Sequence, residues 1–329
     1  MYSKKLLGIT LATTMVFGLA SNAAISAEAF PSRPVKFVVQ FSPGGATDTL
    51  ARMIADKLTA PLGVPVLVEN KPGAGGIIAL DTAVRAGDGG HTLTLISGSA
   101  LMTNEFLHKK LPYDRERDLS MVYQVVEAPL ALVVVPSVTA NTAPELLDYV
   151  SANKGKISYG SYGIGSYPHL MGSHMSQEQD ADMTHIPYKG ESDVMLGLLR
   201  GEIQMQYSSA LLAKPHIESG KIKAIGVSSR KRMPALPEVP TLMEQGLEDE
   251  TYQISGWLGF VTSSNAPQEA VDRMAKEIHA VMQLPEVQKR ASEMGYVPIT
   301  NSSPDVFNAV VKTETPIWKR LIEQSGSAM

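Results

Sequence analysis

Short apolar runs alternate with helical stripes in the N-terminal part of the chain. Runs bounded by glycine or proline predict buried strands at 35–41, 64–69 and 92–96. After the first run, Leu50, Ile54 and Leu58 recur every four residues and form one face of a helix that packs on the strand. This alternation of strand and helix predicts an α/β fold with mostly parallel sheets.

The second half of the chain repeats this pattern. Apolar runs predict strands at 130–135, 157–160, 184–187, 203–207, 223–227 and 257–261. Thr142 and Glu145 form a capping box at the start of a helix, and Ser303 before Pro304 begins the terminal helix. A stripe of period 3.6 marks another helix at 271–282. The last of the apolar runs is expected to be the final strand.

Small or Gly-rich loops follow the strands in both halves, at the strand ends where open α/β sheets bind ligands. Two of these loops lie early, at 41–48 and 97–100, and one lies mid-chain, at 161–166. A helix that starts after a glycine loop offers free amides to an anion. We therefore expect two lobes that face each other across a cleft, an arrangement that suits capture of a small molecule.

The first thirty residues have the order of a secretory signal peptide. Lys4 and Lys5 precede an uncharged apolar run at 6–20, and small residues follow. The run is short for a membrane span, and cleavage is expected after Ala27 or Ala29. The alternative is an uncleaved anchor. Removal of 1–29 takes away two lysines and one glutamate, so the mature chain has a net charge of about −5.

This charge gives no basic surplus for binding nucleic acid. The chain has no cysteine, so disulfides, thiol catalysis and Cys-ligated metals are excluded and the core must carry the fold. About 300 residues suffice for one large or two ordinary domains.

Two glycine loops match the dinucleotide-binding fingerprint only in part. The loop at 73–78 has Ile78 at the sixth position, and the loop at 163–168 has Pro168 there, where glycine or alanine is required. A Gly-Lys-Ser/Thr phosphate loop is also missing. No cofactor is therefore expected.

Catalytic motifs are missing as well. No serine lies in a Gly-x-Ser-x-Gly elbow, and none of the seven histidines belongs to an H-E-x-x-H pair. Asp48 is either a general base or a helix cap, and His169 is either a functional residue or a hydrogen-bonded residue just inside a helix start. The sequence predicts a binding protein rather than an enzyme, with a secreted α/β hydrolase as the alternative from another class.

Nine short blocks stand in order along the chain: FPSRPV at 30–35, FSPGGATD at 41–48, VENKPGAGG at 68–76, LPYD at 111–114, YGS at 159–161, PHL at 168–170, IPYKG at 186–190, SGK at 219–221 and LPEVPT at 236–241. Together they resemble the Bug family of periplasmic solute-binding proteins, the extracytoplasmic receptors of tripartite tricarboxylate transporters. The resemblance runs from Phe30 to near the C-terminus.

The resemblance implies a two-lobed, type II periplasmic-binding-protein fold. Lobe 1 would combine 30–130 with 257–329, lobe 2 would be 131–256, and the runs at 130–135 and 257–261 would cross between them. It also implies a periplasmic monomer whose partners are a small carboxylate and the membrane subunits of a tripartite tricarboxylate transporter. Some relatives signal instead, so a ligand-sensing receptor is a further alternative.

In this family the ligand carboxylate is held by backbone amides, hydroxyls and waters rather than by an arginine, and none of the three loops carries a basic residue. The residues expected to bind the ligand are Phe41, Gly44, Gly45, Ala46, Thr47, Asp48, Ser97, Gly98, Ser99, Ser161, Tyr162, Gly163, Gly165, Ser166, Tyr207 and Ser208. No metal site is expected.

Departures from the family pattern bear on specificity. Tyr162 and Ile164 replace the usual alanine and asparagine, Ser173 stands at a usual glutamate, and the strand that ends near Phe-Asp in relatives ends here at 206–209. If these side chains face the cleft, it gains aromatic surface and loses an acid. The expected ligand is then a carboxylate with an apolar or aromatic body, rather than citrate or an acidic amino acid. The alternative is that Tyr162 packs on its own lobe.

Overall fold

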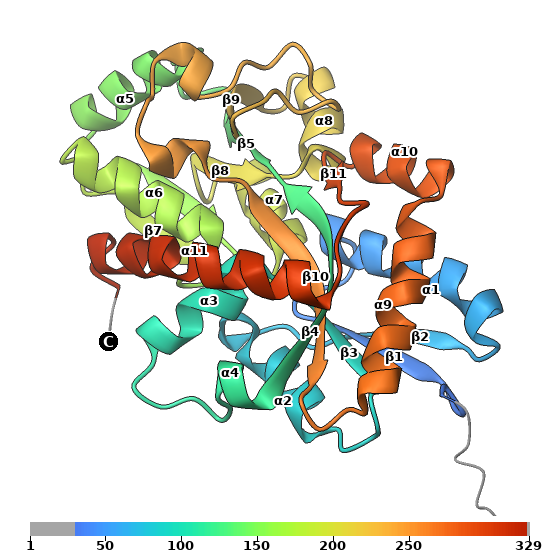
Figure 1. The fold of residues 1–329 in the computed structure, drawn as a ribbon. Helices are drawn as coiled ribbons and strands as arrows, with labels where there is room; N and C mark the ends of the chain where they lie inside the picture. Colours follow the sequence, from blue (N-terminus) through green and yellow to red (C-terminus); the bar gives the residue numbers. More distant parts are fainter. Residues whose placement is uncertain (1–29, 328–329) are drawn as a thin grey trace, which may run out of the picture.

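A computed structural model describes residues 30–327 of the chain. The predicted signal peptide at 1–29 lies outside this range. The described part contains two β-sheets, each flanked by helices (Figure 1). The α/β architecture expected from the sequence is confirmed, with two separate sheets.

The first sheet has six strands in the order β11-β4-β10-β3-β1-β2. Its strands are β1 (Val35–Val39), β2 (Val66–Asn70), β3 (Thr92–Ser97), β4 (Leu119–Ala128), β10 (Gly256–Ser263) and β11 (Val297–Pro298). Its helices are α1 (Ala46–Leu62), α2 (Ile77–Arg85), α3 (Gly98–Leu107), α4 (Arg115–Asp118), α9 (Gln268–Met282), α10 (Pro285–Glu293) and α11 (Pro304–Gln324).

The second sheet has five strands in the order β7-β6-β8-β5-β9. Its strands are β5 (Leu130–Val134), β6 (Ser158–Ser161), β7 (Thr184–Pro187), β8 (Met205–Ser208) and β9 (Lys223–Ser228). Its helices are α5 (Ala143–Ala152), α6 (Tyr167–Glu178), α7 (Glu191–Leu199), α8 (Ala210–Glu218) and the short 3₁₀ helices at Met243–Gln245 and Glu250–Gln253.

The chain passes between the sheets at two neighbouring points. β4 ends at Ala128 and β5 begins at Leu130, while the return passage enters β10 at Gly256. Ala128 and Gly256 are paired across β4 and β10. The two runs expected to cross, 130–135 and 257–261, thus each lie within one sheet, and the passages are at their ends.

Both sheets are mixed, where the sequence predicted mostly parallel ones. β1 pairs in parallel with β2 and β3, but β10 runs antiparallel to β3 and β4. In the second sheet β5 runs antiparallel to β8 and β9. An apolar run indicates that a strand is buried but not its direction. The long antiparallel strands β10 and β5 are those that enter from the other sheet, and the two-residue β11 also pairs antiparallel to β4.

Three local expectations were wrong or incomplete. The ten-residue strand β4 was missed, because Ser120, Gln124 and Glu127 interrupt its apolar run. The segment expected as a loop at 97–100 is the start of α3, which Ser97 caps by accepting a hydrogen bond from the Ala100 amide. The run at 257–261 is not the last strand, since the two-residue β11 follows.

The predicted helical faces are buried as expected. Leu50, Ile54 and Leu58 of α1 have no exposed surface, and α9 buries the stripe predicted at 271–282. Full burial of one such aliphatic side chain stabilises the fold by about 1.5–3 kcal/mol. Ser303 caps α11 by accepting from the Val306 amide, as its sequence indicated.

Helix α11 contacts elements of both sheets (Figure 1). It packs on α3 and β4 of the first sheet and reaches α6 of the second. The Trp318 ring lies edge-on to Tyr167, with ring centroids 5.9 Å apart, and Arg320 pairs with Glu250. The C-terminal helix therefore braces the two halves of the molecule on one side.

Candidate ligand-binding cleft

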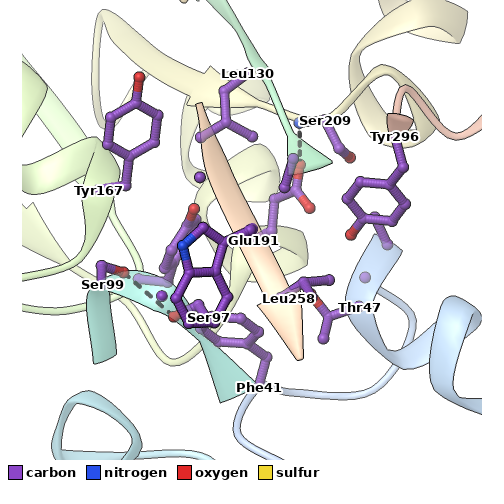
Figure 2. A pocket seen from close by; sticks show the side chains of 17 residues that line it. Phe41, Thr47, Ser97, Ser99, Leu130, Tyr167, Glu191, Ser209, Leu258 and Tyr296 are labelled. Carbon is purple, nitrogen blue, oxygen red and sulfur yellow. Dashed lines mark hydrogen bonds between the residues drawn. The ribbon is translucent and has the colours of Figure 1, made fainter. Parts of the chain in front are cut away.

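A small, partly closed cavity lies where the two sheets meet (Figure 2). Residues of both sheets and of the passages between them line it. The lining residues are Phe41, Gly45, Ala46, Thr47, Ser97, Gly98, Ser99, Ala128, Leu130, Tyr162, Tyr167, Glu191, Ser209, Gly256, Trp257, Leu258 and Tyr296. Half of the residues expected from the sequence are among them: Phe41, Gly45, Ala46, Thr47, Ser97, Gly98, Ser99 and Tyr162.

The start of α1 forms part of the first wall. Gly45 is its N-cap and supplies no side-chain acceptor, and the first amide, of Ala46, faces Glu191 of the other half instead. The first turn therefore presents hydrogen-bond donors to the cavity at the positive end of the helix dipole.

Asp48 lies beside this helix start but does not line the cavity. Its side chain is buried and accepts hydrogen bonds from the Gly44 amide (3.0 Å), Arg52 Nε (3.1 Å) and Asn70 Nδ2 (2.9 Å). Burial alone would raise the pKa of Asp48, but the bonds from Arg52, Gly44 and Asn70 outweigh it and lower the pKa. Asp48 thus holds the 41–48 loop in shape through the Gly44 amide, whereas the N-cap position of α1 is Gly45.

The start of α3 forms the adjoining part of this wall. Ser97 Oγ accepts from Gln40 Nε2 at 2.8 Å and lies 3.2 Å from Ser99 Oγ (Figure 2). A Cβ atom on Gly98 would lie 2.5 Å from the Trp257 ring, so only glycine lets the indole rest on the helix start. The indole is fixed on its other side by its Nε1, which donates to Glu314 of α11 at 2.7 Å.

The mid-chain loop contributes fewer lining residues than expected. Its serines bond within the second half of the molecule: Ser161 Oγ lies 2.6 Å from His185 Nε2, and Ser166 Oγ donates to the Gly163 carbonyl at 2.6 Å. Gly165 and Ser166 line a smaller neighbouring cavity instead. This loop is therefore mainly a structural support for Tyr162.

His169 supports the same loop. Its Nδ1 accepts from the Gly165 amide at 3.2 Å, and burial lowers its pKa to about 4. A neutral, buried histidine that accepts a backbone bond fits the structural alternative left open by the sequence.

Tyr162 reaches the opposite wall. Its ring meets Phe41 edge-on, with ring centroids 4.9 Å apart, and both rings line the cavity. Tyr207 and Ser208, by contrast, do not line it. Tyr207 is 2 % exposed and lies in the core of the second half, and the next lining residue is Ser209. β8 ends at Ser208, one residue beyond the predicted strand, which places the helix-start serine in the wall instead.

Nine lining residues were not expected from the sequence: Ala128, Leu130, Tyr167, Glu191, Ser209, Gly256, Trp257, Leu258 and Tyr296. Most lie at the ends of predicted strands or at predicted helix starts, so the position of the sheet passages was the available signal. Tyr296 follows α10 and had no local motif to single it out.

Glu191 is the acidic side chain of the wall. It begins α7 and accepts from Ser208 Oγ at 3.0 Å and from the Ser209 amide, and it also faces the Ala46 amide of α1. Burial raises its pKa, although the bonds from Ser209, Ser208 and Ala46 favour its ionised form. No lysine, arginine or histidine is among the described residues that line the cavity.

The loops of the two halves touch beside the cavity. Ser42 Oγ donates to Asp193 Oδ2 at 3.0 Å. A Cβ atom on Gly190 would lie 3.0 Å from the Ser42 amide nitrogen, so the two backbones are in close approach. The cavity is therefore shut on this side by direct contact between the 41–46 and 190–193 segments.

Within residues 30–327 no group of three or more acidic or histidine side chains is placed to hold a metal ion. No helix in the same range has the length and apolarity needed to span a bilayer.

Comparisons with known proteins point to one family. The model of the tripartite tricarboxylate transporter family receptor, TctC, matches residues 50–327. A protein encoded in the tcbD-tcbE intergenic region of Pseudomonas sp. strain P51 is 34% identical over 96% of this chain and 92% of its own length.

Two solved structures share the fold. The periplasmic binding protein BugD is 33% identical, with a TM-score of 0.85 over 91% of this chain and 99% of that one. MatC of Rhodopseudomonas palustris, solved with bound malate, is 27% identical, with a TM-score of 0.83 over 89% of this chain and 100% of that one.

Proposed function

Since the chain belongs to the tripartite tricarboxylate transporter receptor family, we propose that it captures a small carboxylate with an apolar or aromatic body and delivers it to the membrane subunits of such a transporter. The family consists of solute-binding proteins and not enzymes, so the chain is a solute-binding protein. The ligand class, the exported periplasmic state after signal cleavage, the monomeric state and the specific transporter are our proposal.

One observation carries the ligand class. The starts of α1 and α3 meet in one wall of a cavity whose other surfaces are mostly aromatic or aliphatic. Amides at a helix start bind an anion through charge-assisted hydrogen bonds and a dipole contribution of about 0.3–1 kcal/mol. Neutral donors also avoid the desolvation of a buried arginine.

The aromatic rings support the apolar body. Phe41, Tyr162, Tyr167, Trp257 and Tyr296 all line the cavity. A polyanion such as citrate would bring its second and third carboxylates against these rings, where no basic side chain compensates the desolvation. A single carboxylate on an aromatic or aliphatic body leaves no such charge unpaired. Malate, bound in the R. palustris relative, is a polar dicarboxylate, so the proposal distinguishes this chain from that neighbour.

The mode of capture follows from the lobes. We propose 30–130 plus 257–329 as lobe 1 and 131–256 as lobe 2, hinged at the paired Ala128 and Gly256. Opening would separate Ser42 from Asp193 and Phe41 from Tyr162, since each pair joins the two halves. Helix α11 contacts both halves and would limit the range of this motion.

The test is thermal unfolding of the mature protein against mono-, di- and tricarboxylates with aliphatic or aromatic bodies. A ligand at 100 times its Kd adds about 2.7 kcal/mol of stability and raises the Tm by several degrees. We expect aromatic or apolar monocarboxylates to give the largest shifts. Calorimetric titration then ranks the ligands that shift the Tm. If none of the carboxylates raises the Tm, the proposal is overturned. If citrate binds as tightly as the aromatic or apolar carboxylates, or more tightly, the part of the proposal that concerns the apolar body is overturned.

A further inference from the structure

Glu191 and Ser209 form a polar corner in an otherwise aromatic cavity. Ser209 is 2 % exposed and lines the cavity, and its Oγ has no partner with full hydrogen-bond geometry among residues 30–327, although it lies close enough to Glu191 to favour the ionised carboxyl. Glu191 lies beside it and accepts the Ser209 amide hydrogen (Figure 2). A buried hydroxyl without a partner costs stability, so this corner is built to receive a polar group.

The groups around Glu191 show which state of the carboxyl the corner favours. Ser208 Oγ, the Ser209 amide and the Ala46 amide all act as donors toward it. These donors stabilise the carboxylate form, while burial raises the pKa of Glu191, so a cation beside the group would offset the cost of burying its charge. The corner is therefore an acceptor, and what it lacks is a donor with positive charge.

The charge of the cavity also favours a positively charged donor at this corner. A ligand carboxylate at the start of α3 would be a second anion in a cavity whose lining residues include no basic side chain. Two like charges in a desolvated site repel strongly unless a cation pairs with one of them. Figure 2 shows Ser97 and Ser99 at one end of the pocket and Glu191 and Ser209 toward the other, so one molecule can contact both ends.

We propose that Glu191 and Ser209 form a subsite for an ammonium group, so that the captured solute is an amino carboxylate with an aromatic or apolar body. Its carboxylate binds at the start of α3, and its ammonium donates to Glu191 and Ser209 Oγ. This inference rests on the proposed function of the cleft and names the class of its ligand.

The experiment compares matched pairs of ligands by calorimetric titration. One pair is phenylalanine and phenylpropionate, and the other is para-(aminomethyl)benzoate and para-methylbenzoate, so that the amine is tested near to and far from the carboxylate. We expect the amine-bearing member of at least one pair to bind about tenfold or more tightly, the scale of a hydrogen bond to a charged group.

Two variants test whether the preference for amine-bearing ligands depends on Glu191 and Ser209. Glu191→Gln keeps the size of the side chain and should reduce the amine preference about tenfold or more, while binding of the amine-free member is unchanged or improved. Ser209→Ala should reduce the preference by a smaller factor. Asp148→Asn is the control, since it removes a negative charge from an exposed face of α5 in the same half of the molecule, outside the cavity. It should leave the ratio of the two affinities within about twofold.

The outcomes separate this inference from the function on which it rests. If amine-free carboxylates bind as well as or better than their amine-bearing partners in both pairs, the ammonium subsite is overturned and the carboxylate cleft stands. The same holds if Glu191→Gln leaves the preference unchanged while the variant unfolds like the parent protein. If none of the four compounds and no other carboxylate binds, the proposed function itself fails.

Discussion

Helices α1 and α3 begin at the same cavity, but their N-termini differ in their caps and in the residues that face them. α1 starts behind Gly45, without a side-chain cap, and its first amide faces Glu191 from the other half of the molecule. α3 starts behind Ser97, whose hydroxyl caps it, and the Trp257 indole rests on its glycine. The start of α1 thus faces a carboxylate of the protein itself, whereas the start of α3 faces no such carboxylate and is available to a ligand.

The difference teaches that a glycine-rich helix start is only half of a binding site. The amides and the dipole are present in both places. What each start can bind depends on the charge that the other half of the molecule places against it. The following substitutions test this contrast.

The largest effect is expected at the two glycines that open the helices. Gly98→Ala places a methyl group 2.5 Å from the Trp257 ring, while Gly45→Ala meets Ser192 Oγ at 3.6 Å and Glu191 Cβ at 4.0 Å, which are ordinary contacts. We expect Gly98→Ala to lower the free energy of unfolding by about 3 kcal/mol through overpacking, and Gly45→Ala by less than about 1 kcal/mol through its poorer cap. Urea denaturation measures both, and equal losses would show that the indole does not constrain α3.

Asp48→Asn tests how the α1 loop is held. Because the folded-state pKa of Asp48 is lowered, its ionised form stabilises the protein above the unfolded pKa, and this stability is lost as pH falls through the folded pKa. We expect the variant to lose about 2 kcal/mol at neutral pH, the scale of hydrogen bonds to a charged group. Its stability should also fall less steeply than that of the parent below about pH 4.

Denaturant curves at several pH values check this prediction. Asp81→Asn is a control, because Asp81 pairs with Arg85 at the same i,i+4 spacing on a more exposed face of α2. An acid dependence that is the same in the Asp48 variant and the parent would contradict the role given to Asp48.

Ser97→Ala tests the cap of α3. The change removes the acceptor for the Ala100 amide and for Gln40 Nε2. We expect a loss of about 1 kcal/mol, typical of an N-cap serine. Ser303→Ala, at the exposed start of α11, removes an equivalent cap that is not among the cavity residues. If both variants lose stability but only Ser97→Ala weakens ligand binding, the α3 start is the ligand-facing one.

The smallest effect is expected for the contact between the walls. Tyr162→Leu removes the edge-on contact with Phe41 and should cost about 0.5–1 kcal/mol in ligand affinity for an aromatic carboxylate. Tyr162→Phe keeps the ring and should bind like the parent. A loss of the same size in both variants, measured by calorimetry, would assign the effect to the hydroxyl rather than to the ring.

Much of the fold could be predicted from the sequence. The stripe of Leu50, Ile54 and Leu58, the Ser303 cap and most strands lie where the pattern predicted them, because each is specified by residues close together in the chain. Strand direction and the polar-interrupted β4 were not readable, since pairing joins segments that lie far apart in the sequence.

The candidate site divides in the same way. The sequence by itself determined the glycine and serine helix starts at 41–47 and 97–99, since a cap and its amides are separated by only a few residues. It also determined the family, through ordered blocks along most of the chain. Only the tertiary structure placed Glu191 against Ala46, left Ser209 Oγ without a partner and set Trp257 on Gly98. These contacts join residues that are far apart in the chain, so they exist only once both halves have folded and come together.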